Sequence, residues 1–157
     1  MKRLCAAVLV ALTSVSCSSS EKAKVSWPTV AVQDIDGNQV NSAQLFHQRT
    51  TIVTMWSTTC VPCRAELPQL QKFASSHSEY DAIAINLGDT PKSVAQFVHE
   101  IGLTLPIAID FEGRVASALG VASVPATLIL STSGKVMDTH LGEITAEELA
   151  ILAETSN

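Results

Sequence analysis

Two cysteines three positions apart, Cys60 and Cys63, most constrain what this chain can fold into. They follow an apolar, β-branched run at 50–56 that is typical of a buried strand, and the apolar residues after them recur at helical spacing. The pair therefore falls where a buried strand passes into the first turn of a helix. Pro62, between the two cysteines, suits that turn because the first turn of a helix needs no N–H group from it.

The number of available cysteines limits the chemistry of this pair. Of four cysteines in the chain, Cys5 and Cys17 belong to an N-terminal sorting segment, which leaves Cys60 and Cys63 as the thiols of the folded domain. A structural zinc site needs about four ligands, and the four histidines show no metal-like spacing. A purely structural disulfide is also disfavoured, because closing so short a loop removes little entropy from the unfolded chain. Redox chemistry is the interpretation that remains, and no metal site is predicted.

The N-terminus is typical of an exported protein. Lys2 and Arg3 precede an apolar run too short to span a bilayer, and small polar residues follow it. The stretch LTSVSCSSS resembles a bacterial lipoprotein signal, which implies a signal peptide over 1–16, lipidation of Cys17 and a flexible tether over 17–26. Ordinary signal-peptide cleavage without lipidation is the alternative.

Export would place the domain in a bacterial periplasm or on the outer face of the membrane. By the same resemblance, Ser18 after the lipidated cysteine favours the outer membrane in a two-membrane cell. The lipid would be the only attachment to a membrane. With 15 acidic against 10 basic residues, the composition gives no electrostatic reason to expect nucleic acid as a partner.

Strands and helices alternate along the rest of the chain, with a hairpin at each end of the series. The pattern predicts a hairpin about Asp36-Gly37, strands at 81–87 and 105–110, helices at 91–102 and 113–120, a second hairpin over 125–142, and a capped helix over 145–154. This order implies one α/β domain, 27–157, with a central mixed sheet and helices on both faces.

The position of the pair at a helix start assigns different roles to the two sulfurs. Unpaired N–H groups and the positive end of the helix dipole stabilise a thiolate at Cys60, which makes it the nucleophile. Cys63, one turn further in and more buried, then attacks the mixed disulfide. Glu66 lies on the same helical face as Cys63 and is placed to accept its proton. From spacing alone, a solvent-exposed helical acid is the simpler interpretation of Glu66.

Several motifs match one family pattern in register: DIDGNQV, the Met55-Trp56 pair ahead of the first cysteine, CVPCRAELP, GLTLPIAID and LGVASVPATLILSTSGKV. With them, the chain resembles the thioredoxin-fold thiol–disulfide oxidoreductases of the TlpA/ResA type, whose relatives include the CcmG proteins of cytochrome c maturation. The resemblance runs from about Trp27 to the C-terminal helix. It implies a thioredoxin-like fold in which the first hairpin is an N-terminal extension.

The resemblance also implies an activity and partners. The protein would reduce disulfides in envelope proteins, with cytochrome c maturation as one setting, and would receive electrons from a membrane thiol transporter. Its partners would be protein disulfides or dithiols. No prosthetic group is expected, because the electrons reside in the Cys60–Cys63 dithiol.

Family resemblance further assigns site residues. It implies a cis peptide bond before Pro125, which would pack against the cysteine pair together with Val124, and a proton-handling role for Glu66. Thr54 stands where thioredoxins proper have a buried aspartate, so Glu66 is the only candidate base near the pair. Thr59 stands where the family has a tryptophan that shapes the docking surface. The residues expected at the substrate side of the site are Trp56, Thr59, Val61, Pro62 and Val124.

Two other functions fit part of the pattern. A peroxiredoxin-like thiol peroxidase has a Thr or Ser three residues before its attacking cysteine, and Ser57 satisfies this. The proline expected four residues before Ser57 is replaced by Val53, and a Cys-x-x-Cys pair is an unusual resolving arrangement. A non-enzymatic Cu(I)-binding lipoprotein would use Cys60 and Cys63 as soft ligands. The cysteine count does not exclude this copper site, because it needs no set of four ligands as zinc does.

Overall fold

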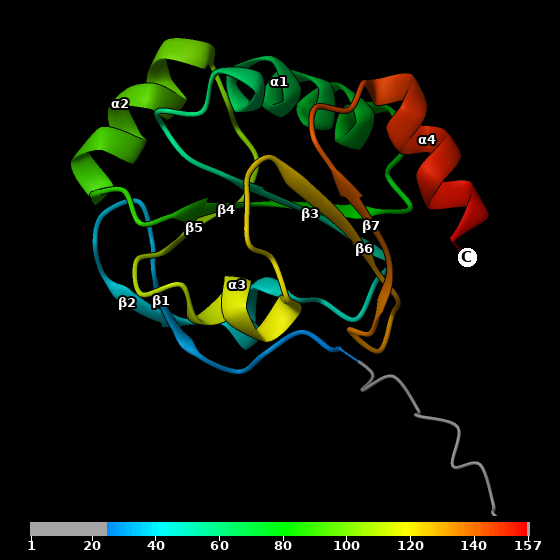
Figure 1. The fold of residues 1–157 in the computed structure, drawn as a ribbon, viewed down its shortest axis with the longest axis horizontal. Coiled ribbons are helices and arrows are strands. Elements are labelled where there is room, and N and C mark those ends of the chain that lie inside the picture. The colour runs from blue at the N-terminus through cyan, green and yellow to red at the C-terminus, as the bar shows by residue number, and fades with distance from the viewer. Residues whose placement is uncertain (1–24, 157) are drawn as a thin grey trace, which may run out of the picture.

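A computed structural model describes residues 25–156 of the chain, in which a seven-stranded mixed sheet lies between two layers of helices (Figure 1). The strands follow the order β2-β1-β5-β4-β3-β6-β7 across the sheet. The predicted signal peptide, the lipidation site at Cys17 and most of the predicted tether lie outside the described residues.

The centre of the sheet is parallel. Strands β3 (Thr51–Trp56), β4 (Asp81–Leu87) and β5 (Ile107–Asp110) run in the same direction, so their carboxyl ends meet at one edge. All six residues of β3 are buried. A strand covered on both faces needs a continuous apolar or β-branched run, which is the pattern of these segments in the sequence.

Antiparallel strands flank this centre on both sides. The first hairpin is β1 (Ala31–Gln33) and β2 (Gln39–Asn41), and β1 pairs with β5. The second hairpin is β6 (Ala126–Leu130) and β7 (Val136–Leu141), and β6 pairs with β3 so that Met55 lies opposite Ala126. The start of β6 therefore lies beside the end of β3.

Three helices cover one face of the sheet: α1 (Val61–Ser76), α2 (Pro91–Ile101) and α4 (Ala146–Thr155). The short helix α3 (Arg114–Leu119) and the 3₁₀ turn η1 (Ser42–Leu45) lie on the other face (Figure 1). Thr145 and Glu148 form the predicted capping box of α4. The fold predicted from the sequence, a thioredoxin-like mixed sheet covered on both faces, is confirmed.

One predicted boundary is wrong by two residues. Val25 and Ser26, assigned to the tether, belong to the domain: the Val136 N–H donates to the Val25 carbonyl at 2.9 Å, and Ser26 forms a β-bridge with Lys135. The side chain of Val25 also packs against the core. Backbone pairing with a hairpin over a hundred residues later has no local sequence signal, so the sequence does not reveal that the domain begins at Val25.

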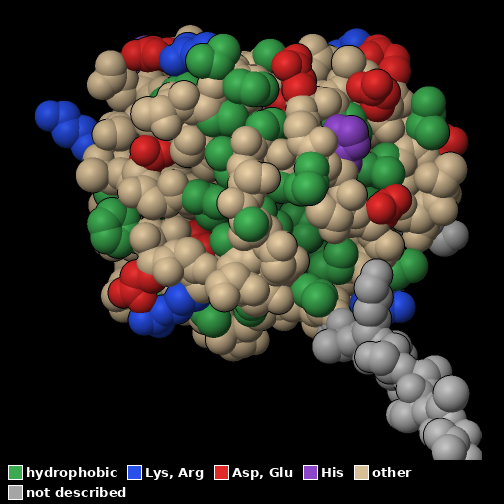
Figure 2. All heavy atoms as spheres, viewed as in Figure 1, with side chains coloured by type: hydrophobic (Ala, Val, Ile, Leu, Met, Phe, Trp, Pro, Cys, Tyr) green, Lys and Arg blue, Asp and Glu red, His purple; other side chains and the backbone are tan. Residues whose placement is uncertain are grey.

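The surface carries mixed charge. On the face shown in Figure 2, acidic and basic side chains lie scattered among neutral and hydrophobic ones, in keeping with a modest net charge of −5. Between residues 25 and 156, no helix combines the length and the apolar character needed to cross a bilayer.

Candidate functional site at the β3–α1 junction

The cysteine pair lies where β3 ends and α1 begins. Cys60 is the N-cap of α1 and Cys63 lies in its first turn, and the two form a disulfide with an S–S distance of 2.08 Å. Cys60 is half-buried, whereas Cys63 is completely buried. An incoming thiol or disulfide can therefore reach the sulfur of Cys60 but not that of Cys63.

The helix start favours negative charge on Cys60. Its Sγ accepts a hydrogen bond from the backbone N–H of Cys63 at 3.2 Å, in the manner of an oxygen at an N-cap. In the reduced protein the same N–H and the helix dipole stabilise a thiolate at this position. The geometry thus agrees with Cys60 as the nucleophile.

The loop before β6 forms an apolar wall beside the sulfurs, made of Val124 and Pro125. The Val124–Pro125 peptide bond is cis, as the resemblance implies. Val124 belongs to the same hydrophobic cluster as Cys60 and Cys63, and Pro125 is buried behind it. The Gly142 N–H, just beyond β7, donates to the Pro125 carbonyl at 3.0 Å and holds the loop in place.

Glu66 is buried, so its interpretation as a solvent-exposed helical acid is wrong. Its Oε1 accepts a hydrogen bond from the Thr127 hydroxyl at 2.7 Å, and the hydroxyls of Thr127 and Thr54 lie 2.8 Å apart. Because Thr127 gives its proton to Glu66, Thr54 must be the donor in the second bond. Thr54 and Thr127 are both fully buried, so these hydroxyls form a short chain that ends at the carboxyl group.

The charge state of Glu66 depends on opposing influences. Burial is the strongest influence and raises the pKa of the Glu66 carboxyl, as does the nearby Glu143. The hydrogen bond from Thr127, the adjacent Thr54 hydroxyl and His140 lower this pKa. Its Oε2 is buried and has no hydrogen-bond partner among residues 25–156. A carboxyl group with one unpaired buried oxygen readily holds a proton, which suits a group that accepts one from a neighbouring thiol.

The predicted substrate-side residues divide into two sets. Thr59 and Pro62 are exposed, and Val61 is 82% exposed, an unusual value for a large apolar side chain, so all three can contact a partner beside Cys60. Trp56 is completely buried and cannot contact one. Its assignment to the substrate side is wrong, because β3 is covered on both faces up to its last residue.

Trp56 instead supports the site from behind. Its ring packs against Phe97 of α2 with centroids 5.0 Å apart, and the Arg64 guanidinium lies 4.5 Å above the same Phe97 ring. Arg64 also pairs with Glu100 at 3.4 Å. These contacts join the first turn of α1 to α2 and were not predicted, because no motif links the two helices.

Asp89 is a site residue that the sequence did not reveal. Its Oδ2 accepts a hydrogen bond from the backbone N–H of Thr58 at 2.7 Å and another from the Asn86 side chain at 2.8 Å. The Asp89 N–H donates in turn to Asn86 Oδ1 at 3.1 Å. This Asn86–Asp89 clamp fastens the loop that carries Cys60 to the end of β4. The only available signal was a polar residue, Asn86, inside a buried strand.

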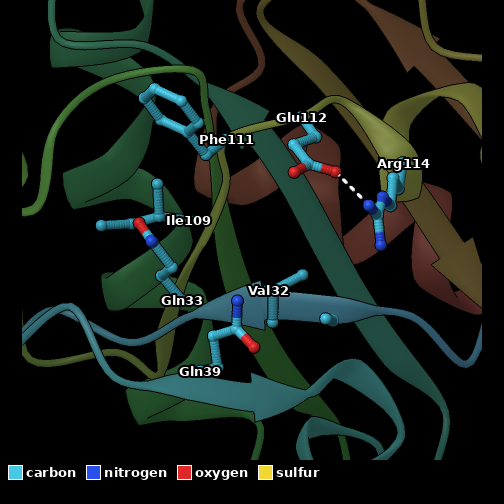
Figure 3. Close-up of a pocket in the computed structure, with 8 residues that line it drawn as sticks. Val32, Gln33, Gln39, Ile109, Phe111, Glu112 and Arg114 are labelled. Atoms are coloured by element: carbon cyan, nitrogen blue, oxygen red, sulfur yellow. Dashed lines mark ion pairs between the residues drawn. The ribbon is translucent and has the colours of Figure 1, made fainter.

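The site is a surface rather than a cavity. A pocket of about 80 Å³ lies between the β1–β2 hairpin and the loop after β5, where Gln33, Phe111 and the Glu112–Arg114 ion pair line it (Figure 3). It contains none of the predicted site residues, and neither does a larger hollow of about 480 Å³ that Trp27, Phe46 and Gly134 line. Within residues 25–156, no three His, Cys, Asp or Glu side chains lie together as metal ligands would.

Comparisons with known proteins agree with this geometry. Residues 24–139 match the model of the AhpC/TSA family. Thiol-disulfide oxidoreductase ResA of Bacillus thuringiensis (strain Al Hakam) is 29% identical over 124 residues, which cover 78% of this chain and 71% of that protein. The predicted resemblance to the TlpA/ResA type is thereby confirmed.

Solved structures show the same fold. StoA from Bacillus subtilis is 26% identical, with a TM-score of 0.66 and coverage of 80% of this chain and 96% of that one. A DsbF homologue from Corynebacterium diphtheriae is 27% identical, with a TM-score of 0.70 and coverage of 87% and 88%.

Proposed function

The chain belongs to the AhpC/TSA family, and we propose that it acts in the cell envelope as a thiol–disulfide oxidoreductase that reduces disulfides in exported proteins. One observation carries the proposal: the disulfide has one sulfur that a partner can reach, at a helix N-terminus, and one that it cannot. Two-step thiol–disulfide exchange needs this asymmetry, because the first sulfur must meet the substrate and the second must meet only the first.

The reaction proceeds through a mixed disulfide. The Cys60 thiolate attacks one sulfur of the substrate disulfide, that bond breaks, and the departing substrate sulfur leaves as a thiolate that takes a proton from solvent. Cys63 then gives its proton to Glu66 and attacks the Cys60 sulfur, which releases the second substrate sulfur. Two electrons pass from the dithiol to the substrate, and the Cys60–Cys63 disulfide is formed.

Residues around the pair hold the substrate in this scheme. Thr59, Val61 and Pro62 would contact it on the α1 side, and Val124, backed by the buried Pro125, would contact it on the other side. Thr59 leaves this surface smaller than a tryptophan would. We therefore expect the site to accept partners of varied shape.

The dithiol must be reduced again after each turnover. An exported compartment tends to oxidise thiols, so a membrane thiol transporter is the proposed electron donor, and no prosthetic group is required. The proposal includes export through the signal at 1–16 and attachment through a lipid on Cys17. Apocytochromes awaiting haem are one class of substrate that this placement would serve.

Cysteine variants test the proposal. We expect Cys60→Ser to abolish the reduction of a disulfide-bonded protein substrate, and Cys63→Ser to accumulate a mixed disulfide with it. The covalent complex is detected by mass spectrometry and dissolved by excess thiol. Trapping by Cys60→Ser through Cys63 would reverse the assigned roles.

The reduction potential of the pair tests the direction. Equilibration in graded thiol buffers followed by alkylation of free thiols should give a reduction potential of about −270 mV, that of thioredoxin. A reduction potential of about −120 mV would identify an oxidant. The two alternatives are measured with the same reduced protein. Rapid consumption of hydrogen peroxide would indicate a thiol peroxidase, and tight Cu(I) binding without exchange would indicate a copper-binding protein.

A further inference from the structure

The hydrogen bonds of the Glu66 carboxyl group do not fully offset the cost of its burial in the charged form. The carboxyl group is completely buried, and so are Thr54 and Thr127, the hydroxyls that lead to it. Under the proposed function, on which this inference rests, Glu66 must be ionised when Cys63 gives up its proton. Burial opposes that ionisation more strongly than the hydroxyl groups of Thr127 and Thr54 favour it, so a positive charge nearby would further stabilise the carboxylate.

His140 is placed to supply that charge. It lies on β7 directly opposite Thr127 of β6 in the antiparallel ladder, and Thr127 lies opposite Thr54 of β3. Side chains of residues directly opposite in adjacent strands lie on the same face of a sheet. His140 therefore lies on the face that α1 covers, one strand beyond the hydroxyl that donates to Glu66.

The imidazole also reaches solvent. β7 is the edge strand of the sheet, and His140 is only partly buried. Its Nε2 lies 3.3 Å from the Glu143 carbonyl oxygen in the loop before α4, which fixes the orientation of the ring. His140 thus lies one strand away from Thr127, between the hydroxyl that donates to Glu66 and bulk water.

Other charges near these groups are acidic. Glu143, in the loop after β7, acts on Glu66 against ionisation, and Glu148, in the first turn of α4, lies close enough to His140 for its own carboxylate to be stabilised. Cys63 is the remaining titratable group near Glu66 on α1. Within the described residues, His140 is the basic side chain whose charge would lower the pKa of the Glu66 carboxyl.

We propose that His140 is a positioning residue that controls the charge of Glu66: the protonated imidazole stabilises the buried carboxylate, and the neutral imidazole does not. A nearby positive charge lowers the pKa of a carboxyl group. The protonated form of His140 would therefore keep Glu66 available as a base at pH values where the buried carboxyl group would otherwise hold its proton.

The proposal is tested by the titration of Glu66 itself, followed by carbon NMR of glutamate-labelled protein in the oxidised state. In H140Q the pKa of the Glu66 carboxyl should be higher than in the native protein, because the cation is gone. In H140K, which restores a positive charge, it should return toward the native value. H99Q, a change to an exposed histidine on α2, should leave it unchanged.

A second measurement connects the titration to turnover. The rate at which Cys63 releases a substrate from the mixed disulfide on Cys60 should fall in H140Q by about threefold to tenfold in the pH range where the Glu66 carboxyl titrates. It should change little at higher pH, where Glu66 is ionised in both proteins. Because the NMR titration needs no turnover, it decides the proposal even if the protein lacks exchange activity. The proposal would be overturned if the pKa of the Glu66 carboxyl were unchanged in H140Q, or if it rose equally in H140Q and H140K.

Discussion

Under the proposed function, Glu66 is a residue at which stability and activity oppose each other. Its burial raises the pKa of the carboxyl above the ordinary value of 4.5. The unfolded chain therefore loses the Glu66 proton at a lower pH than the folded protein does. From about pH 4.5 upward the unfolded state is favoured by this difference, which grows until the folded-state pKa is passed and then stays constant.

Removing the ionisable group should therefore stabilise the protein at neutral pH. We expect Glu66→Gln to unfold at a higher urea concentration than the native protein at pH 7 and at nearly the same concentration below about pH 4, with the disulfide intact in both. The same change should slow the Cys63 step by about 100-fold, the lower range of general-base catalysis. A variant that is less stable at pH 7 would show that the Glu66 carboxylate is stabilised in the fold.

At the scale of elements, the junction between β3 and α1 depends on a neighbouring loop. The Asn86–Asp89 clamp holds the Thr58 N–H, two residues before Cys60, against the end of β4. Cys60 itself is bonded to this loop through its N–H and the Ser57 carbonyl at 3.2 Å. Movement of the loop would therefore move Cys60, the proposed nucleophile, relative to the end of β4.

Two changes at Asp89 separate position from charge. Asp89→Ala leaves the Thr58 N–H and the Asn86 amide without an acceptor, which should cost about 1–3 kcal/mol of unfolding free energy and expose the Thr58 amide to hydrogen exchange. Asp89→Asn keeps an acceptor oxygen in the same place and should retain most of the Thr58 protection. NMR hydrogen exchange gives the comparison. Native-level protection of Thr58 in Asp89→Ala would show that the clamp does not hold the loop.

At the scale of the whole molecule, the sheet is stabilised by separate apolar layers on its two faces. Leu70 of α1 is completely buried between β3, β4 and α4, with Phe73 and Leu149 in the same cluster. The cysteine pair belongs to a neighbouring cluster with Leu67 and Phe97. Packing around Leu70 thus stabilises the domain without touching the sulfurs.

A core change and a surface change should differ accordingly. Leu70→Ala should lower the unfolding free energy of the oxidised protein by about 2–5 kcal/mol, whereas Ile151→Ala, at a side chain 63% exposed on α4, should change it by no more than about 0.5 kcal/mol. Neither should alter the reduction potential of the pair. Urea unfolding measures the first effect, and equal losses in both variants would contradict the assigned core.

Local sequence patterns were sufficient for the elements that face a single kind of environment. The strand at 81–87 was predicted with the bounds that β4 has, because it is mostly apolar and β-branched and ends before Gly88. The position of Cys60 at the start of a helix followed equally directly from the strand before it and the apolar spacing after it. The cis bond before Pro125 is different, because it followed from family resemblance and no local rule implies it.

Apolar periodicity and turn residues within a few positions of one another were enough to predict the sheet, its covering helices and the position of the cysteine pair. The burial of Glu66, the place of Trp56 behind the site and the hydrogen bonds by which Asp89 holds the Cys60 loop depend on packing between distant segments. Glu66 meets Thr127, 61 residues away in the chain, and Thr58 meets Asp89, 31 residues away. Periodicity shows which face of an element is buried, but the residues that a buried side chain contacts depend on how distant segments pack together.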